Sequence, residues 1–229
     1  MQETGLEPDI AIRIALGTSL FVILLNSISV ALKYHEKHAV QWKQATLMGI
    51  VGSITSFGGA AVASRLSALT LSTIFGIVVI IGALKIYVTP AVRENGEISS
   101  NQMLYILAGV SIGFFSGLLG IGGGVIAIPI MLIFLHFDMR KAVGTSSAVI
   151  MFTSFGGSIG YIINGIGQPG LPPYSLGYIN LIDWILLVIP GFFGARKGAD
   201  IAHVVNPEHL KHLFVLLMIY VGLKMIGII

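Results

Sequence analysis

The sequence predicts an all-α polytopic membrane protein, and three observations carry this prediction. Of the 229 residues, 55% are hydrophobic and 10% are charged, with a mean hydropathy of +0.92, whereas a soluble domain carries about 25% charged residues. The charges are clustered, and the uncharged runs between them approach or exceed the roughly 20 helical residues that cross a bilayer core. We therefore expect a multi-pass protein of the cell membrane. The runs are Ile14–Leu32, Ala45–Ser64, Leu66–Leu84, Ile98–Leu135 and Ala142–Ile182.

Charge and cysteine content exclude several functions. The net charge is +3, but the basic residues flank the apolar runs, so they indicate topology rather than nucleic-acid binding. The absence of cysteine excludes disulfides, thiolate metal sites and iron–sulfur clusters. Acidic residues at Glu3, Glu7 and Asp9 are the wrong charge for the start of a signal peptide, so we expect the first span to be retained.

Residues 1–92 are predicted to form a first repeat of three transmembrane helices. The first helix contains a Gly-Thr-Ser motif, in "ALGTSLFVILLNSISVALKY" (Ala15–Tyr34). The second is entered near Trp42, and the third contains "IFGIVVIIGALK" (Ile74–Lys85). A polar linker is expected at residues 93–101.

Residues 102–229 are predicted to form a second repeat with the same three helices in the same order. They contain "AVGTSSAVIMFTSFGGSIGY" (Ala142–Tyr161), a helix entered near Trp184, and "LFVLLMIYVGLK" (Leu213–Lys224). The ordered recurrence of Gly-Thr-Ser, Tyr, Trp and Leu-Lys favours a duplication. Chance similarity between apolar helices is the alternative.

The second repeat begins with an additional apolar run, Ile98–Leu135, which contains "GLLGIGGGVIAIP" (Gly117–Pro129). As one helix its 38 residues would reach about 57 Å, too long for one crossing and too short for two. We therefore expect a Gly-rich re-entrant helical hairpin. Residues Gln102–Leu119 enter the membrane, the glycines turn, and Pro129 lies near the start of the returning half.

The distribution of basic residues supports this hairpin. If Ile98–Leu135 returns to the side it entered, ten of the thirteen lysines and arginines share one side, and Arg13, Arg65 and Lys224 lie on the other. A single crossing would divide them seven to six. The ten-to-three division is what the positive-inside rule expects. On this interpretation the two repeats are inverted, as in many secondary transporters, and both termini face outward.

The glycine-rich turn is the strongest candidate for a binding site. Non-helical backbone at membrane depth is tolerated only where it lines a cavity or is buried in protein. The N–H groups of Gly122, Gly123, Gly124 and Val125, at the positive end of a half-helix, can hold an anion without an arginine. Glycines that only allow close helix packing are the alternative.

Hydroxyl and amide groups near the helix starts extend this candidate site. Hydroxyls of the two Gly-Thr-Ser motifs can donate to an anion, or they can cap helices. Asn26 lies mid-span, where it either bonds across helices or lines the pathway. The candidate substrate-binding residues are Gly120, Gly122, Gly123, Gly124, Thr18, Ser19, Thr145, Ser146 and Asn26.

No catalytic residues, metal site or cofactor are expected. The uncharged runs contain no paired acids and no histidine at depth. His209 and His212 lie three residues apart, but no third ligand accompanies them. The partners we expect are a small anionic substrate and membrane lipid, with no nucleic acid. Homo-oligomerisation is left open.

The segment "GFFSGLLGIGGGVIAIPIML", followed by "KAVGTSSAVI", resembles the signature of the TauE/SafE sulfite exporter family. The resemblance implies a secondary transporter of two homologous halves that moves sulfite or organosulfur anions, such as sulfonates and thiosulfate. The family pattern has a second Gly-rich hairpin before the first Gly-Thr-Ser helix, where this sequence has only residues 1–13. A truncated or non-transporting membrane subunit and an anion channel are therefore the alternatives.

Overall fold

The computed structural model describes residues 7–88 and 99–228, and the fold is almost entirely helical. The helices of the first part are α1 (Pro8–Glu36), α2 (Trp42–Ala63) and α3 (Ala68–Val88). Most of the predicted linker at residues 93–101 lies outside the described residues. The elements of the second part are α4 (Gln102–Leu119), α5 (Gly124–Ile133), α6 (Met139–Gly165), β1 (Ser175–Leu176), β2 (Ile179–Asn180), α7 (Leu181–Val204) and α8 (Pro207–Ile226).

Six of the described helices are long and apolar enough to cross a membrane: α1, α2, α3, α4, α6 and α8. This confirms the prediction of an all-α polytopic membrane protein. Helix α7 was expected to cross as well, but it falls outside these six. Asp183 lies in its first turn, and Arg196, Lys197 and Asp200 lie in its second half. These charges exceed what a mid-membrane segment usually contains.

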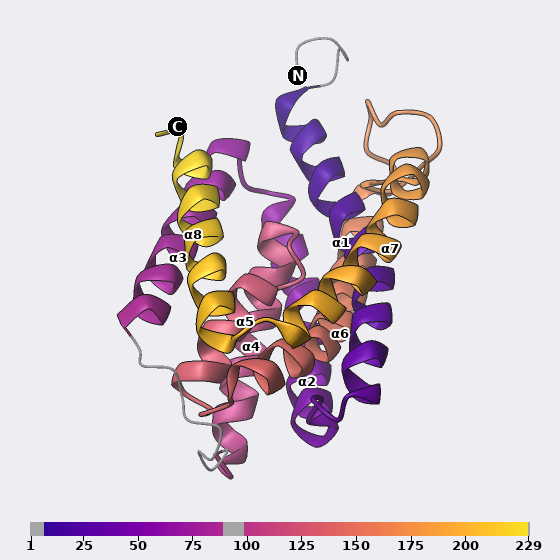
Figure 1. The fold of residues 1–229 in the computed structure, drawn as a ribbon. Helices are drawn as coiled ribbons and strands as arrows, with labels where there is room; N and C mark the ends of the chain where they lie inside the picture. The colour runs from indigo at the N-terminus through magenta and orange to yellow at the C-terminus, as the bar shows by residue number, and fades with distance from the viewer. Residues whose placement is uncertain (1–6, 89–98, 229) are drawn as a thin grey trace.

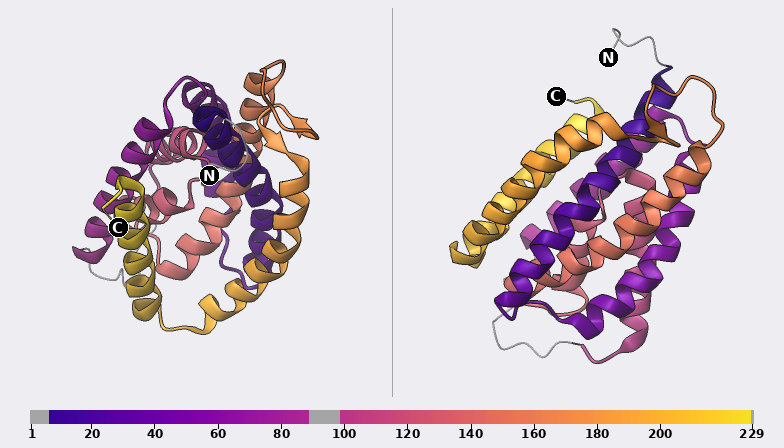
Figure 2. Two further views of the ribbon diagram at one scale, coloured as in Figure 1. Left: turned by 90° about the horizontal axis from the view of Figure 1, so that it is seen from above. Right: turned by 90° about the vertical axis from the view of Figure 1, so that its right-hand side faces the viewer.

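The helices alternate in direction along the long axis of the molecule (Figure 1). Helices α1 and α3 run from the upper to the lower end, whereas α6 and α8 run upward. Between them α4 rises from the lower end and α5 descends again, so the chain returns to the end from which it entered. Both termini lie at the upper end (Figures 1 and 2). The count of basic residues on each side assumed this path of the chain through the membrane. The division into two repeats stays a prediction.

The hairpin differs from the expected pair of half-helices in two ways. Its arms are unequal, because α4 has 18 residues and α5 has 10. Pro129 lies inside α5 and not near its start, since Gly123 is the N-cap and the helix begins directly at Gly124. The prediction for Pro129 was therefore wrong. Its ring faces α3, where a Cβ on Gly82 would lie 3.7 Å from the proline Cγ.

Small residues let α2 and α4 approach closely. A Cβ on Gly113 of α4 would lie 2.5 Å from the Cα of Gly52 in α2, closer than Cβ atoms are found in proteins. Gly109, four residues earlier, faces the backbone of Met48 in the same way. The alternative interpretation of glycine as a packing residue thus holds along α4.

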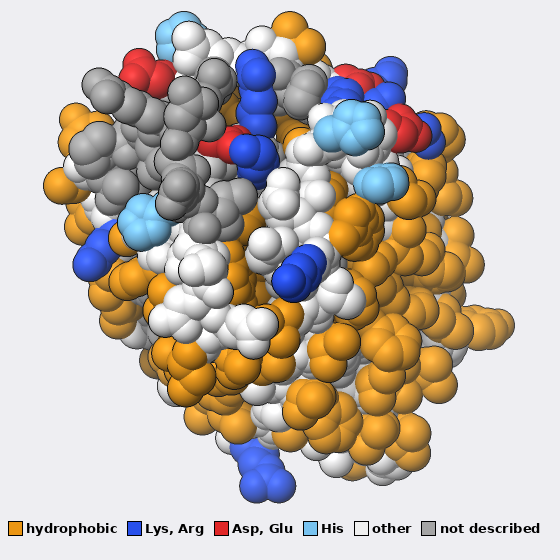
Figure 3. All heavy atoms as spheres, turned by 90° about the horizontal axis from the view of Figure 1, so that it is seen from below, with side chains coloured by type: hydrophobic (Ala, Val, Ile, Leu, Met, Phe, Trp, Pro, Cys, Tyr) orange, Lys and Arg blue, Asp and Glu red, His pale blue; other side chains and the backbone are white. Residues whose placement is uncertain are grey.

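The exterior is apolar along the helices and polar at the lower end. Side chains such as Leu186 of α7 and Leu216 of α8 are 66% and 68% exposed, as expected for surfaces that face lipid. Seen from above, α7 and α8 lie at the rim of the bundle (Figure 2). Seen from below, lysine, arginine and histidine side chains gather on part of the face, with hydrophobic side chains around it (Figure 3).

Candidate substrate site at the glycine turn

The turn between α4 and α5 is built from left-handed glycines. Gly120, Gly122 and Gly123 have φ angles of 67°, 70° and 80°, which residues with a Cβ adopt only at a cost. The Gly120 N–H donates to the Ser116 carbonyl at 3.0 Å and ends α4. The Gly123 carbonyl accepts from Ala127 at 2.8 Å and starts α5. The chain therefore reverses within four residues.

The turn is enclosed by α1, α4 and α6. Thr153 of α6 donates its hydroxyl to the Gly122 carbonyl at 3.0 Å. A Cβ on Gly122 would lie 2.7 Å from Ile23 of α1 and 3.0 Å from the Ser154 Oγ of α6. Protein thus surrounds the turn, which meets the condition for irregular backbone at membrane depth.

Four N–H groups of this turn have no backbone acceptor outside helix α5 in the part of the chain that the structure describes. Across the described residues, the N–H groups of Gly122, Gly123, Gly124 and Val125 donate no hydrogen bond that meets ordinary geometric limits. Those of Gly124 and Val125 belong to the first turn of α5, where helix geometry leaves them without an intrahelical acceptor. Together with the positive end of the helix they favour an oxyanion.

The threonines of the two Gly-Thr-Ser motifs each hold the start of a distant helix. The Thr145 Oγ1 in α6 accepts from the N–H of Gln41, the N-cap of α2, at 3.1 Å. The Thr18 Oγ1 in α1 accepts from the N–H of Asn180, the N-cap of α7, at 3.0 Å. Each bond crosses from one predicted repeat to the other. Accepting it leaves the hydroxyl proton able to donate to an anion.

The remaining predicted site residues lie in other places. The Ser146 Oγ donates to the Val143 carbonyl of its own helix at 2.9 Å. Asn26 is half-buried and lies beside Gly191 of α7. Ser19 and Thr18 line a groove of about 1000 Å³ between α1 and α7, together with Asn180 and Asp183. The structure thus brings the four glycines together, but it does not bring the hydroxyls of both motifs to the turn.

Two buried serines at the turn were missed by the sequence reasoning. Ser116 of α4 and Ser154 of α6 are both 0% exposed, and their hydroxyls have no hydrogen-bond partner within the described part of the chain. Serine is common in membrane helices, so a single serine gives no signal. The recurrence of Ser154, Ser158 and Tyr161 along one helix face could have shown Ser154.

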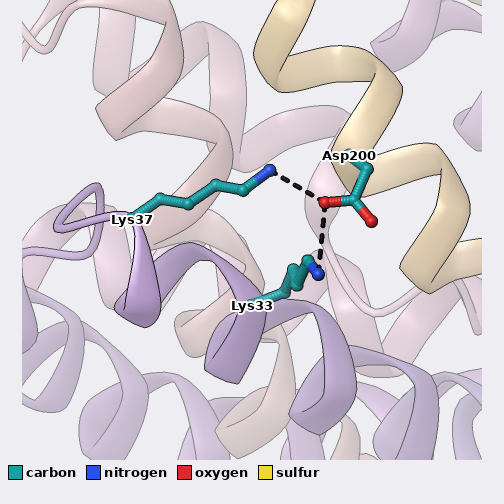
Figure 4. Close-up of polar contacts among 3 residues, drawn as sticks. All are labelled: Lys33, Lys37 and Asp200. Atoms are coloured by element: carbon teal, nitrogen blue, oxygen red, sulfur yellow. Dashed lines mark hydrogen bonds and ion pairs between the residues drawn. The ribbon is translucent and has the colours of Figure 1, made fainter.

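At the lower end of the molecule, ion pairs connect α1 and α7. Lys33 and Lys37 both approach the Asp200 Oδ1, at 3.3 and 3.0 Å (Figure 4). One carboxylate therefore neutralises only one of two ammonium groups. The excess positive charge at this end attracts anions. Across the residues that the structure describes, no group of three histidine, aspartate or glutamate side chains could hold a metal ion.

Comparisons with known proteins give one family and several membrane transporters. A model of the sulfite exporter TauE/SafE family matches residues 6–225. A probable membrane transporter protein of Methanocaldococcus jannaschii is 32% identical over 221 residues, which cover 96% of this chain and 80% of the relative. The probable membrane transporter protein YunE of Bacillus subtilis is 27% identical over 241 residues, 97% of this chain and 84% of the relative. No solved structure matches.

Proposed function

Because the chain belongs to the sulfite exporter TauE/SafE family of membrane transporters, we propose that it is a secondary carrier of small anions. Its proposed substrates are sulfite and organosulfur anions, including sulfonates and thiosulfate. The observation that carries this proposal is the glycine turn, whose free N–H groups lie inside the protein at the positive end of α5. Neighbouring N–H groups at the start of a helix suit an ion with several acceptor oxygens.

The same turn suits release as well as binding. The segment from Gln102 to Ile133 contains no lysine or arginine, so a bound anion is held by dipoles alone. Hydrogen bonds to a charged group contribute about 1.5–3 kcal/mol each, whereas a buried ion pair would hold the anion more firmly. A carrier needs a site from which the substrate can leave.

The position of the turn between α1 and α6 supports alternating access. These helices contain the two Gly-Thr-Ser motifs, and their crossed bonds from Thr18 and Thr145 link the predicted repeats. We infer that the repeats rock against each other about this contact, as in other transporters with inverted repeats. The anion at the turn would then face each side of the membrane in succession.

A flux screen tests the proposal. The purified chain in proteoliposomes is expected to take up radiolabelled sulfite, thiosulfate or methanesulfonate, at rates that saturate with concentration. Measuring each anion with and without a pH gradient identifies the coupling ion. Liposomes without protein are the control, and equal uptake of all three anions into both preparations would contradict the proposal. Uptake that never saturates would favour the anion channel.

One observation favours the alternative of a non-transporting or incomplete subunit. Gly52 of α2 is buried against its neighbours. In the predicted repeat it corresponds to Gly194 of α7, where an added Cβ would meet nothing within 4 Å. Among the described residues no hairpin covers this face of α7. If a further element is required there, the purified chain will bind sulfite without moving it.

A further inference from the structure

Three buried hydroxyls lie along one face of α6. Ser154, Ser158 and Tyr161 follow each other at intervals of four and three residues, the spacing that places side chains on one side of a helix. They are 0%, 2% and 0% exposed. None of the three hydroxyls has a hydrogen-bond partner in the part of the chain that the structure describes. Burial of an unpaired hydroxyl is unfavourable, so this row requires an explanation.

Several serines elsewhere in the helices do find a partner, although Ser29 and Ser56 do not. The Ser27 Oγ in α1 donates to the Leu24 carbonyl at 2.9 Å, and the Ser111 Oγ in α4 donates to the Leu107 carbonyl at 2.9 Å. Bonding to a carbonyl one turn earlier is thus available to a helical serine. Ser154 and Ser158 do not use it, so their hydroxyls are left for another acceptor.

At its lower end the row of hydroxyls borders the glycine turn. The Ser154 Oγ lies 3.0 Å from the place of a Cβ on Gly122, and the Ser116 Cβ lies 3.2 Å from that of Gly123. Two unpaired hydroxyls, one from α6 and one from α4, therefore flank the free N–H groups of the turn. These side chains indicate a ligand independently of the helix terminus.

At its upper end the row of hydroxyls approaches the guanidinium group of Arg13. Tyr161 packs against Gly17 of α1, where an added Cβ would lie 3.0 Å from the tyrosine Cβ. Arg13, one turn earlier in α1, donates to the Tyr178 hydroxyl at 3.5 Å, and the Tyr178 N–H donates to the Tyr161 carbonyl at 3.2 Å. The Arg13 Nε is buried and has no hydrogen-bond partner within the described residues. Since α6 runs upward (Figure 1), the seven helical steps from Ser154 to Tyr161 rise by about 10 Å.

We propose that Ser154, Ser158 and Tyr161 line the upper half of the anion's passage, between Arg13 and the glycine turn, and that Ser116 completes the binding site at the turn. The proposal rests on the proposed function. Arg13 attracts the anion from the upper side, and each hydroxyl donates to it in turn. At the turn the backbone N–H groups donate hydrogen bonds to the anion in place of the hydroxyls. The row is closed in this structure and opens when α1 moves away from α6.

Cysteine labelling tests the passage without assuming a substrate. The chain has no cysteine, so S154C and S158C each introduce a single thiol of nearly the same size as the serine. The probe is 2-sulfonatoethyl methanethiosulfonate, a small sulfonate that does not cross lipid. It forms a mixed disulfide with the thiolate and releases methanesulfinate. The control is S27C, because Ser27 is also buried, at 6% exposed, but its hydroxyl is bonded within α1.

We expect S154C and S158C in proteoliposomes to be labelled at least tenfold faster than S27C. Excess methanesulfonate, a proposed substrate that does not react with the probe or with disulfides, is expected to slow the labelling of S154C. Equal, slow labelling of all three variants would overturn the passage. Fast labelling of S154C and S158C in a chain that moves none of the tested anions would overturn the proposed substrates and leave the passage standing.

Alanine variants separate transport from packing. If the hydroxyls only fill space, S154A and S158A remove an unpaired buried group, so stability stays equal or rises and transport does not change. If the hydroxyls donate to the anion, the melting temperature again stays equal or rises. The KM for sulfite, however, rises by about tenfold in S154A. The control S27A is expected to keep wild-type flux. Wild-type KM and flux in both S154A and S158A would overturn the inference.

Discussion

Thr18 and Thr145 occupy the same place in the two Gly-Thr-Ser motifs, and each accepts an N–H from the start of a helix far along the chain. The bonded residues are separated by 162 and 104 positions. No local pattern reveals such a partner, which explains why the sequence suggested helix capping and anion binding with equal force. The glycines of the turn were easier to predict, because a run of glycine in an apolar segment has few other uses.

We expect T18V and T145V to destabilise the protein. Valine has the shape of threonine without the acceptor, so the N–H of Asn180 or Gln41 is left buried and unpaired. The expected cost is about 1–3 kcal/mol of the free energy of unfolding. The measurement is the thermal unfolding midpoint in detergent, with T18S and T145S as controls that keep the oxygen. A T18V variant as stable as wild type would show that the bond to Asn180 adds nothing.

The arrangement of whole helices followed from apolar run lengths and charge, but their details did not. The hairpin was predicted because 38 uncharged residues fit neither one crossing nor two. Its unequal arms depend on where α4 stops, and this is set by the left-handed conformation of Gly120. The β1–β2 pair after α6 was not predicted, since two-residue strands leave no periodic signal.

The glycines of α4 and α7 lead to a prediction about how whole helices pack. We expect G113A to cost about 2 kcal/mol, because an added Cβ would meet the backbone of Gly52 and force α2 and α4 apart. The control is G194A in α7, whose Cβ meets nothing within 4 Å. It is expected to leave the unfolding midpoint unchanged or to raise it, because alanine favours a helix more than glycine does. Equal destabilisation by both variants would show that the glycine of α7 is also packed in the membrane.

For the molecule as a whole, the charge distribution predicts orientation. The end that holds Lys33, Lys37 and Lys141 is expected to face the cytoplasm, because basic residues are retained there. Both termini lie at the opposite end (Figure 1). We therefore expect reporter enzymes that are active only outside the cytoplasm to be active at either terminus. A cytoplasmic C-terminus would contradict the inverted repeat.

The sequence and the fold indicate the chemical class of the substrate rather than one particular anion. Composition and spacing indicate a small anion, and the family adds its sulfur chemistry. The N–H groups of Gly122 and Gly123 recognise oxygen acceptors without distinguishing sulfite from other oxyanions. Discrimination between oxyanions therefore falls to the side chains beside the turn, among them Ser116 and Ser154.

The central claim is that the glycine turn binds the transported anion, and sulfite flux through G123V tests it most directly. Gly123 has a φ of 80°, and a Cβ there would lie 2.9 Å from the Ile112 carbonyl oxygen, so valine both strains the turn and moves its N–H groups. The control is G58V in α2, where an added Cβ meets nothing within 4 Å. Gel filtration of both variants checks that they are folded. We predict wild-type flux in G58V and background flux in folded G123V, and wild-type flux in G123V would contradict the claim.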